Sequence, residues 1–266
     1  GNVFASPPTS TMEAVAREVE GGAGVLFLFG NYQGDVMNFE MAQEALEEDG
    51  IQCDTILVAD DVASAPSSSA GERRGIAGLV FAYKIAGAAA AQGLSLAETV
   101  NITRHALESI RTIGVALGPC MVPAAGKPTF ELGDDEMEVG MGIHGEPGIE
   151  RTRLRSSAEI SDELVRRVSE DGPFASGESV ALLVNSLGAT PLEELYILYH
   201  DVLGSLAKKN LSVERTFVGR YACSMEMPGA SITLMKLDAT LTPLLDFPTA
   251  SPLISFGLPY NGPHQP

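Results

Sequence analysis

The sequence predicts an α/β protein made of two α/β domains, each with a mixed sheet flanked by helices. Its 266 residues are enough for one large domain or two ordinary ones. Hydrophobic residues make up 45% of the chain and charged residues 20%, a balance typical of a globular protein with a sizeable core. Patterns typical of helices and of strands alternate along the chain, and this alternation indicates the α/β class.

The first elements are a helix, a buried strand and a second helix. Residues 11–20 have the pattern of a helix, and the continuous apolar run at 24–29 predicts a strand that is buried on both faces. A loop at 30–34 then leads into a helix that we expect at 36–48. Asp35 stands immediately before this helix, at the place of an N-cap residue.

The next strand is expected at 55–59 and ends in two acids, Asp60 and Asp61. Open α/β sheets bind ligands at the carboxyl ends of their strands, so these acids lie at a favourable place for a site. A helix rich in small residues is expected at 76–91, and another helix at 96–112.

The composition changes near Ile113, where glycine and proline become dense. We therefore expect a first domain at 1–113, a second domain at 114–248, and a proline-rich linker or tail at 249–266. The second domain is expected to contain a helix at 161–171, a strand at 179–185, a helix at 191–208, and strands at 213–221 and 231–237.

The formal charge of −18 comes from 35 acidic residues against 17 lysines and arginines. A chain this acidic repels phosphate backbones and anionic membrane surfaces, so we expect neither a nucleic acid nor a membrane as partner. The chain shows no charged-then-apolar leader and no apolar stretch long enough to span a bilayer. Cys53, Cys120 and Cys223 match no zinc or disulfide spacing, and free thiols are typical of the reducing cytosol. We therefore expect a soluble, cytoplasmic protein.

His144 is the first candidate for chemistry, because it lies in the run GIHGEPG. The small residues on both sides leave the imidazole accessible and let the backbone approach a ligand. A single histidine in a loop is more often a surface or capping residue than a catalyst. The residues alone therefore indicate only an accessible imidazole in a glycine-rich loop.

Asp35 is the second candidate, in the run NYQGDVMNF. It can serve as the N-cap of the following helix, or as a general base or hydroxyl acceptor at the carboxyl edge of the sheet. These two alternatives stay open at this point.

Nucleotide and metal motifs are missing from the sequence. No GxGxxG run follows a strand and opens a helix, and no GK[ST] run occurs, so the chain offers no recognisable cradle for nucleotide phosphates. The acids at 134–136 match no metal-binding loop and are expected to form a solvated turn.

A set of longer runs resembles the K domain of dihydroxyacetone kinases in both the residues of each run and the order of the runs along the chain. These runs are GNVFASP (1–7), NYQGDVMNFE (31–40), DDVA (60–63), RRGIAG (73–78), KIAGAAAAQG (84–93), GVALGPCMVP (114–123), EMEVGMGIHGEPGI (136–149), LLVNSLGATPLEELY (182–196) and CSMEMPGASITLMKLD (223–238). No single run is sufficient, but the ordered set covers about residues 1–248 and is highly specific.

The resemblance implies that the protein holds a short ketose such as dihydroxyacetone for phosphoryl transfer. His144 would form a hemiaminal with the substrate carbonyl, and a carbonyl, unlike a polyol, can be attacked by a neutral imidazole. Asp35 would bind the terminal hydroxyl and act as its base. The remaining substrate-binding positions that the resemblance implies are Ser6, Gly30, Asn31 and Gly34.

The resemblance also implies what lies outside this chain. ATP, or an ADP that a phosphotransfer protein rephosphorylates, would be bound with Mg²⁺ on an L domain or subunit, in agreement with the missing phosphate-binding motif. This chain itself is expected to bind no metal or cofactor. The family forms dimers, so we expect a homodimer.

Two departures from the family pattern bear on the function. The family's opening segment, with its GSGHEP-like run, does not occur in this sequence, which begins after it. The family's lysine before the NYxGD run is Gly30 here. Loss of that cation fits either a kinase for a four-carbon ketose such as erythrulose or a non-catalytic ketose sensor that acts as a coactivator.

Overall fold

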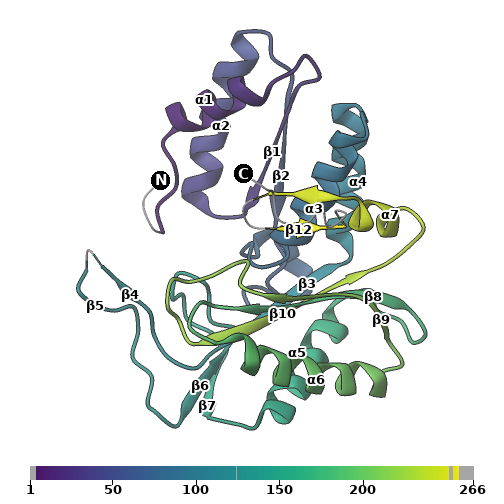
Figure 1. The fold of residues 1–266 in the computed structure, drawn as a ribbon. Coiled ribbons are helices and arrows are strands. Elements are labelled where there is room, and N and C mark those ends of the chain that lie inside the picture. Colours follow the sequence, from purple (N-terminus) through teal and green to yellow (C-terminus); the bar gives the residue numbers. More distant parts are fainter. Residues whose placement is uncertain (1–3, 124, 252–253, 258–266) are drawn as a thin grey trace, which may run out of the picture.

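The computed structural model describes residues 4–123, 125–251 and 254–257 (Figure 1). Its helices are α1 (Thr9–Val19), α2 (Gln33–Glu48), the short 3₁₀-helix η1 (Ser67–Glu72), α3 (Leu79–Ala91), α4 (Leu96–Glu108), α5 (Ser157–Asp171), α6 (Leu192–Lys208) and α7 (Leu241–Asp246). Its strands are β1 (Val25–Gly30), β2 (Cys53–Val58), β3 (Ile110–Ala116), β4 (Met121–Val122), β5 (Lys127–Pro128), β6 (Glu136–Val139), β7 (Glu150–Arg153), β8 (Ser179–Ser186), β9 (Ser212–Gly219), β10 (Gly229–Lys236), β11 (Thr249–Ala250) and β12 (Ser255–Phe256).

A small parallel sheet of β1 and β2 stands above a six-stranded sheet in Figure 1. Val25, Phe27 and Phe29 alternate along β1 and are buried against α1 and α2. Phe29 stacks on Phe39 of α2 with ring centroids 4.0 Å apart. The predicted strand at 24–29 is therefore confirmed, and its packing places the carboxyl end of β1 beside the start of α2.

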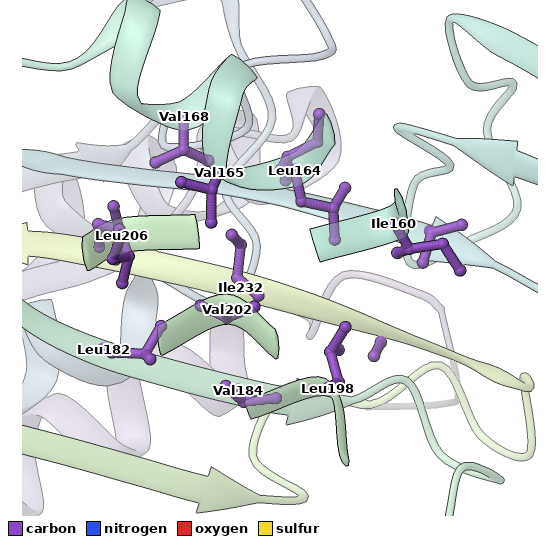
Figure 2. Packing of buried hydrophobic residues seen from close by; sticks show 14 of the residues in the cluster. Ile160, Leu164, Val165, Val168, Leu182, Val184, Leu198, Val202, Leu206 and Ile232 are labelled. Carbon is purple, nitrogen blue, oxygen red and sulfur yellow. The ribbon is translucent and has the colours of Figure 1, made fainter. Parts of the chain in front are cut away.

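The six-stranded sheet has the order β7-β6-β3-β10-β8-β9 in the described part of the chain. All its neighbouring strands are antiparallel except β8 and β9, so the sheet is mixed, as predicted. Helices α5 and α6 cover one face, and α3, α4 and α7 cover the other. Figure 2 shows Leu164 and Val168 of α5 and Val202 of α6 packed toward Leu182 and Ile232 of the strands.

The predicted division between residues 113 and 114 is not where the structure separates its parts. Both residues lie inside β3, which pairs with β10 and β6. Phe81 of α3 also shares one buried cluster with Leu183 and Met235 of the larger sheet. The dense glycine and proline that suggested a boundary belong to the loops that follow β3, not to a linker between two cores.

Several further element boundaries differ from the sequence prediction, among them the start of α3, which was expected at 76 and lies at Leu79. Helix α4 ends at Glu108, so the expected helix at 96–112 runs too far. Helix α5 begins at Ser157 because Ser156 and Glu159 form a capping box upstream of the expected start at 161. Of the expected tail at 249–266, β11 and β12 pair as a short hairpin, while residues 252–253 and 258–266 lie outside the described residues. Within the described residues, every helix is too short or too polar to cross a bilayer.

Candidate functional site

The loop between β6 and β7 carries His144. Its backbone closes on itself, because the N–H of Gly142 donates to the carbonyl of Glu146 and the N–H of Gly145 donates to the carbonyl of Gly142. Gly145 has a φ of 85°, in the left-handed region that favours glycine. The tight turn leaves the His144 side chain 30% exposed, so the imidazole is accessible, as the sequence predicted.

Two aromatic rings from the N-terminal part of the chain contact the imidazole edge-on. The ring centroid of Phe4 is 4.9 Å from that of His144, and that of Tyr32 is 4.7 Å away. Tyr32 is the residue immediately before α2. His144 therefore lies where the small-sheet region meets the loop between β6 and β7.

Glu146 holds His144 through both carboxylate oxygens. Its Oε1 lies 3.1 Å from the imidazole Nδ1, and its Oε2 accepts the backbone N–H of His144 at 3.0 Å. Burial raises the pKa of Glu146, but hydrogen bonds from the His144 side chain and from backbone N–H groups outweigh it and lower the pKa to about 2. The imidazole Nε2 has no hydrogen-bond partner in the part of the chain that the structure describes.

Arg74 lies behind Glu146 and connects it to β2. Its Nη1 is 4.0 Å from Glu146 Oε2, and its Nη2 donates to the carbonyl of Gly140 at 2.9 Å. The same guanidinium pairs with the fully buried Asp61, at 2.7 Å. Burial, partly offset by Arg74, raises the pKa of Asp61 to about 6.

The two acids at the end of β2 support the site and do not line it. Asp60 is buried and accepts the backbone N–H groups of Ile76 and Gly78, each at 2.7 Å, and burial raises its pKa. Asp61 is occupied by Arg74. The sequence singled out these acids as a favourable place for a ligand, but in the structure their carboxylates bind Arg74 and the backbone of the following segment.

The 30–35 segment approaches from the opposite side. The side-chain amide of Asn31 donates to the carbonyls of Gly71 and Arg73 at 3.0 and 2.8 Å. A methyl group added at Gly34 would lie 2.6 Å from Ser6 Oγ, so these two residues are in contact. A methyl group at Gly30 would lie 3.2 Å from the Tyr32 ring, which therefore covers Gly30 and also contacts His144.

Asp35 lies in the first turn of α2 and is not its N-cap. The helix begins at Gln33, three residues before the expected start, and the residue at the N-cap position is Tyr32. An acid in the first turn is favoured by the helix dipole. The Asp35 charge, after burial, contributes to the raised pKa of Tyr83 on α3, so the two side chains are close enough to interact electrostatically.

The contacts thus link Gly30 to His144 through the Tyr32 ring and Ser6 to Gly34, and Asn31 and Asp35 belong to the same 30–35 segment. Sequence reasoning assigned no role to Tyr32, Arg74 or Glu146. A glutamate two residues after a histidine in a glycine run was an available signal for Glu146.

Metal ligands do not form a cluster at this site or elsewhere among the described residues. Cys53, Cys120 and Cys223 are free, with Cys120 buried and the other two partly buried. The expected solvated turn at 134–136 is partly wrong, because Glu136 begins β6 and accepts the N–H of Gly133.

The comparisons with known proteins give one consistent family. The model of the Dak1 domain matches residues 1–253. The dihydroxyacetone-binding subunit DhaK of PTS-dependent dihydroxyacetone kinase 1 from Listeria innocua is 45% identical over 90% of this chain and 72% of its own length. The D-erythrulose kinase of Mycolicibacterium smegmatis is 38% identical over 97% of this chain and 44% of its own length.

Solved structures agree with these sequences. The dihydroxyacetone kinase operon co-activator Dha-DhaQ superposes with a TM-score of 0.87 at 33% identity, over 93% of this chain and 77% of its own. The dihydroxyacetone kinase of C. freundii in complex with AMP-PNP and Mg²⁺ gives a TM-score of 0.82 at 30% identity, over 92% of this chain and 45% of its own. The predicted α/β fold and the resemblance to K domains are confirmed, and this chain belongs to the Dak1 domain family.

Proposed function

We propose that this chain is the ketose-binding part of a dihydroxyacetone-type kinase and that His144 holds the substrate carbonyl as a hemiaminal. The observation that carries the proposal is the state of the His144 ring. Its Nδ1 is bonded to Glu146, whereas its Nε2 has no partner among the described residues and the side chain is 30% exposed. A nitrogen with a free lone pair in an accessible loop is suited to attack a carbonyl carbon.

A covalent bond at this position also explains selectivity. Dihydroxyacetone and glycerol differ only at the central carbon, and hydroxyl contacts in a small wet pocket discriminate weakly between them. Only the ketone has a carbonyl that an imidazole can attack. The hemiaminal would therefore select ketoses and leave a terminal hydroxyl free for phosphorylation.

The 30–35 segment would bind the rest of the ketose. Asp35 is proposed as the base that accepts the proton of the terminal hydroxyl during phosphoryl transfer. Ser6, which contacts Gly34, and the backbone around Gly30 and Asn31 would orient that hydroxyl. Support comes from the shared junction, because the Tyr32 ring contacts both Gly30 and His144.

The phosphoryl donor is proposed to lie on a partner L domain or subunit. The L. innocua relative is named as one subunit of a PTS-dependent kinase, and the C. freundii kinase was solved with AMP-PNP and Mg²⁺. ATP, or ADP that is rephosphorylated, would reach this chain with its Mg²⁺ from that partner. We also propose that the chain works in the cytoplasm as a homodimer.

A second candidate function rests on Gly30. The Tyr32 ring occupies the space over this residue, so a lysine here would have to displace it. A pocket that lacks this cation fits a four-carbon ketose such as erythrulose, or a sensor without kinase activity. Among the similar proteins, one is named D-erythrulose kinase and another operon co-activator, which are examples of these two alternatives.

Native mass spectrometry with dihydroxyacetone, erythrulose and glycerol tests the proposal. We expect a mass gain of one whole ketose, with no water lost, for the unmodified chain and none with glycerol. His144→Ala should abolish the gain, whereas His200→Ala, an exposed position on α6, should keep it. A gain that survives His144→Ala, or no gain with any ketose, would contradict the proposal.

Phosphorylation separates the two candidate functions. An L partner with its phosphoryl donor should convert the ketose that forms the adduct into its phosphate if the chain is a kinase part. A ketose adduct that stays unphosphorylated under these conditions would identify a sensor. Comparing the dissociation constants of the two adducts would show whether dihydroxyacetone or erythrulose is the preferred ketose.

A further inference from the structure

Four side chains from three parts of the chain form a polar series that ends at the His144 ring. Asp61 after β2 pairs with Arg74 at 2.7 Å, and Arg74 approaches Glu146 at 4.0 Å. Glu146 in turn contacts His144 Nδ1 at 3.1 Å. Asp61 is fully buried and the Arg74 side chain is only 14% exposed, so the far end of the series is well fixed.

The two oxygens of Glu146 have different partners, and this division determines which nitrogen of His144 carries hydrogen. Oε2 accepts the backbone N–H of His144, a donor that cannot reverse its role. Oε1 faces Nδ1, and a carboxylate only accepts hydrogen bonds, so Nδ1 must be the protonated nitrogen. The lone pair of the neutral ring is then on Nε2.

We propose that Glu146 is a positioning residue that keeps His144 in the Nδ1–H tautomer and balances the positive charge that the ring gains during hemiaminal formation. Arg74, anchored on Asp61, would hold Glu146 in place for this role. The inference rests on the proposed function and deepens it, because it assigns residues to the attacking step.

The attacking step balances without a co-reactant other than water. The Nε2 lone pair forms a bond to the carbonyl carbon, and the electron pair of the C=O π bond moves to oxygen. The resulting alkoxide takes a proton from a water molecule and becomes the hemiaminal hydroxyl. The hydroxide that is left passes to the solvent, so the step as a whole takes up one proton from the solvent. The ring is now positive and keeps its proton on Nδ1, where the Glu146 carboxylate compensates the charge. Release of the ketose reverses each of these changes.

Glu146→Gln tests the assignment sharply because it changes the hydrogen-bonding pattern while keeping the size. The amide oxygen must face the His144 backbone N–H, so the amide NH₂ group must face Nδ1. Nδ1 then becomes an acceptor and the hydrogen moves to Nε2, which removes the attacking lone pair. Glu193→Gln, at an exposed position of α6, is the matched control for the loss of one charge.

The tautomer is read by ¹⁵N NMR of histidine-labelled protein without any ketose, and the adduct by native mass spectrometry with dihydroxyacetone. We expect Nδ1–H in the unmodified chain and in Glu193→Gln, and Nε2–H in Glu146→Gln. The dissociation constant of the ketose adduct of Glu146→Gln should rise roughly ten- to a hundredfold, the range found for residues that orient histidine ligands of metal ions. Glu146→Asp should recover part of this loss, since it restores the carboxylate.

The outcomes separate this inference from the proposed function. An unchanged tautomer and an unchanged adduct in Glu146→Gln would overturn the role of Glu146 while leaving the hemiaminal standing. Absence of an adduct in the unmodified chain would refute the hemiaminal, and the tautomer measurement would still decide whether Glu146 sets the state of the ring. Arg74→Lys provides a second variant. It should shift the tautomer equilibrium and weaken the adduct in the same direction as Glu146→Gln, but to a smaller extent.

Discussion

The two segments that meet at His144 are held in place by different forces. The loop between β6 and β7 depends on charged hydrogen bonds, with Glu146 bound to His144 and Arg74 behind it. The 30–35 segment depends on packing and on neutral hydrogen bonds, with the Tyr32 ring over Gly30. If the proposed function holds, this difference means that the reactivity of the ring and the shape of the ketose-binding site depend on separate parts of the chain and can be changed separately.

Both segments rely on one ion-pair cluster that joins the small-sheet region to the larger sheet. Asp171, the last residue of α5, accepts from Arg73 at 2.6 and 2.7 Å and from Arg111 of β3 at 2.7 Å. The Arg73 side chain is only 1% exposed. Arg73 also supplies a carbonyl that fixes Asn31, and it directly precedes Arg74, so the cluster supports both sides of the site.

The largest expected effect comes from breaking this cluster with Asp171→Asn. The substitution leaves the buried guanidinium of Arg73 without a counter-charge, and breaking a buried ion pair in this way costs about 3–5 kcal/mol. We expect a correspondingly lower free energy of unfolding in urea and weaker binding of any ketose. Urea unfolding followed by circular dichroism measures the first effect.

The control is Asp49→Asn, which removes the exposed partner of Arg17 in the small-sheet region. That pair is 41% and 58% exposed, so its loss should cost less than about 1 kcal/mol. Equal losses for the two variants would contradict the special role of the cluster.

Acid provides a second test of the cluster. Burial raises the pKa of Asp171, but its bonds to Arg73, Ser67 and Arg111 lower it overall from 3.8 to about 2. The stabilisation is therefore complete above pH 3.8 and is lost as the pH falls through 2, and Asp171→Asn should lack this dependence.

A smaller effect is expected from Gly142→Ala, which disturbs only the charged side of the comparison. A methyl group here would collide with Glu146 Oε2 and Arg74 Nη1. Both atoms are at the ends of flexible side chains. The fold should therefore persist, while the Glu146 and Arg74 side chains are displaced from their present positions. We expect the adduct of every ketose to weaken by about tenfold or more, as for other orienting residues.

The matched control for Gly142→Ala is Gly87→Ala in α3, where an added methyl group meets nothing within 4 Å. This change should leave the adduct unaffected and stabilise the helix by about 0.5–1 kcal/mol. An adduct of normal strength in Gly142→Ala would show that the position of Glu146 has no influence on the ring.

The comparison also explains how much the sequence could predict. The apolar run of β1 and the glycine run around His144 depend on neighbours in the sequence, so the buried strand and the accessible imidazole were predicted correctly. The role of Arg74 could not be predicted, because its contact with Gly140 joins residues 66 positions apart. The division at residue 113 failed for a related reason, since pairing of β3 with β10 is invisible to local composition.

The start of α2 shows the same limit on a smaller scale. Asp35 has the residue type and position of an N-cap, and the sequence alone left its role open between cap and base. The helix starts at Gln33, and Asn31, two residues earlier, donates to carbonyls about 40 residues away. Asp35 therefore lies inside the first turn and does not occupy the N-cap position, which is a condition for the role proposed for it.

The smallest expected effect, and the one that most sharpens the comparison, is that of Gly30→Ala. The added methyl group would lie 3.1 Å from the Gly75 carbonyl oxygen and 3.2 Å from the Tyr32 ring, so the ring must move by a few tenths of an ångström. This alters the shape of the pocket without touching Glu146. We expect the ratio of the dissociation constants for dihydroxyacetone and erythrulose to change by up to about tenfold, the lower end of what one methyl group contributes to discrimination. The His144 tautomer should stay the same, whereas Gly142→Ala should weaken the binding of both ketoses to the same extent.

Gly21→Ala, with nothing within 4 Å, controls for the change of residue type. A shifted tautomer in Gly30→Ala, or a uniform loss of both ketoses, would mean that reactivity and shape are controlled by the same contacts after all.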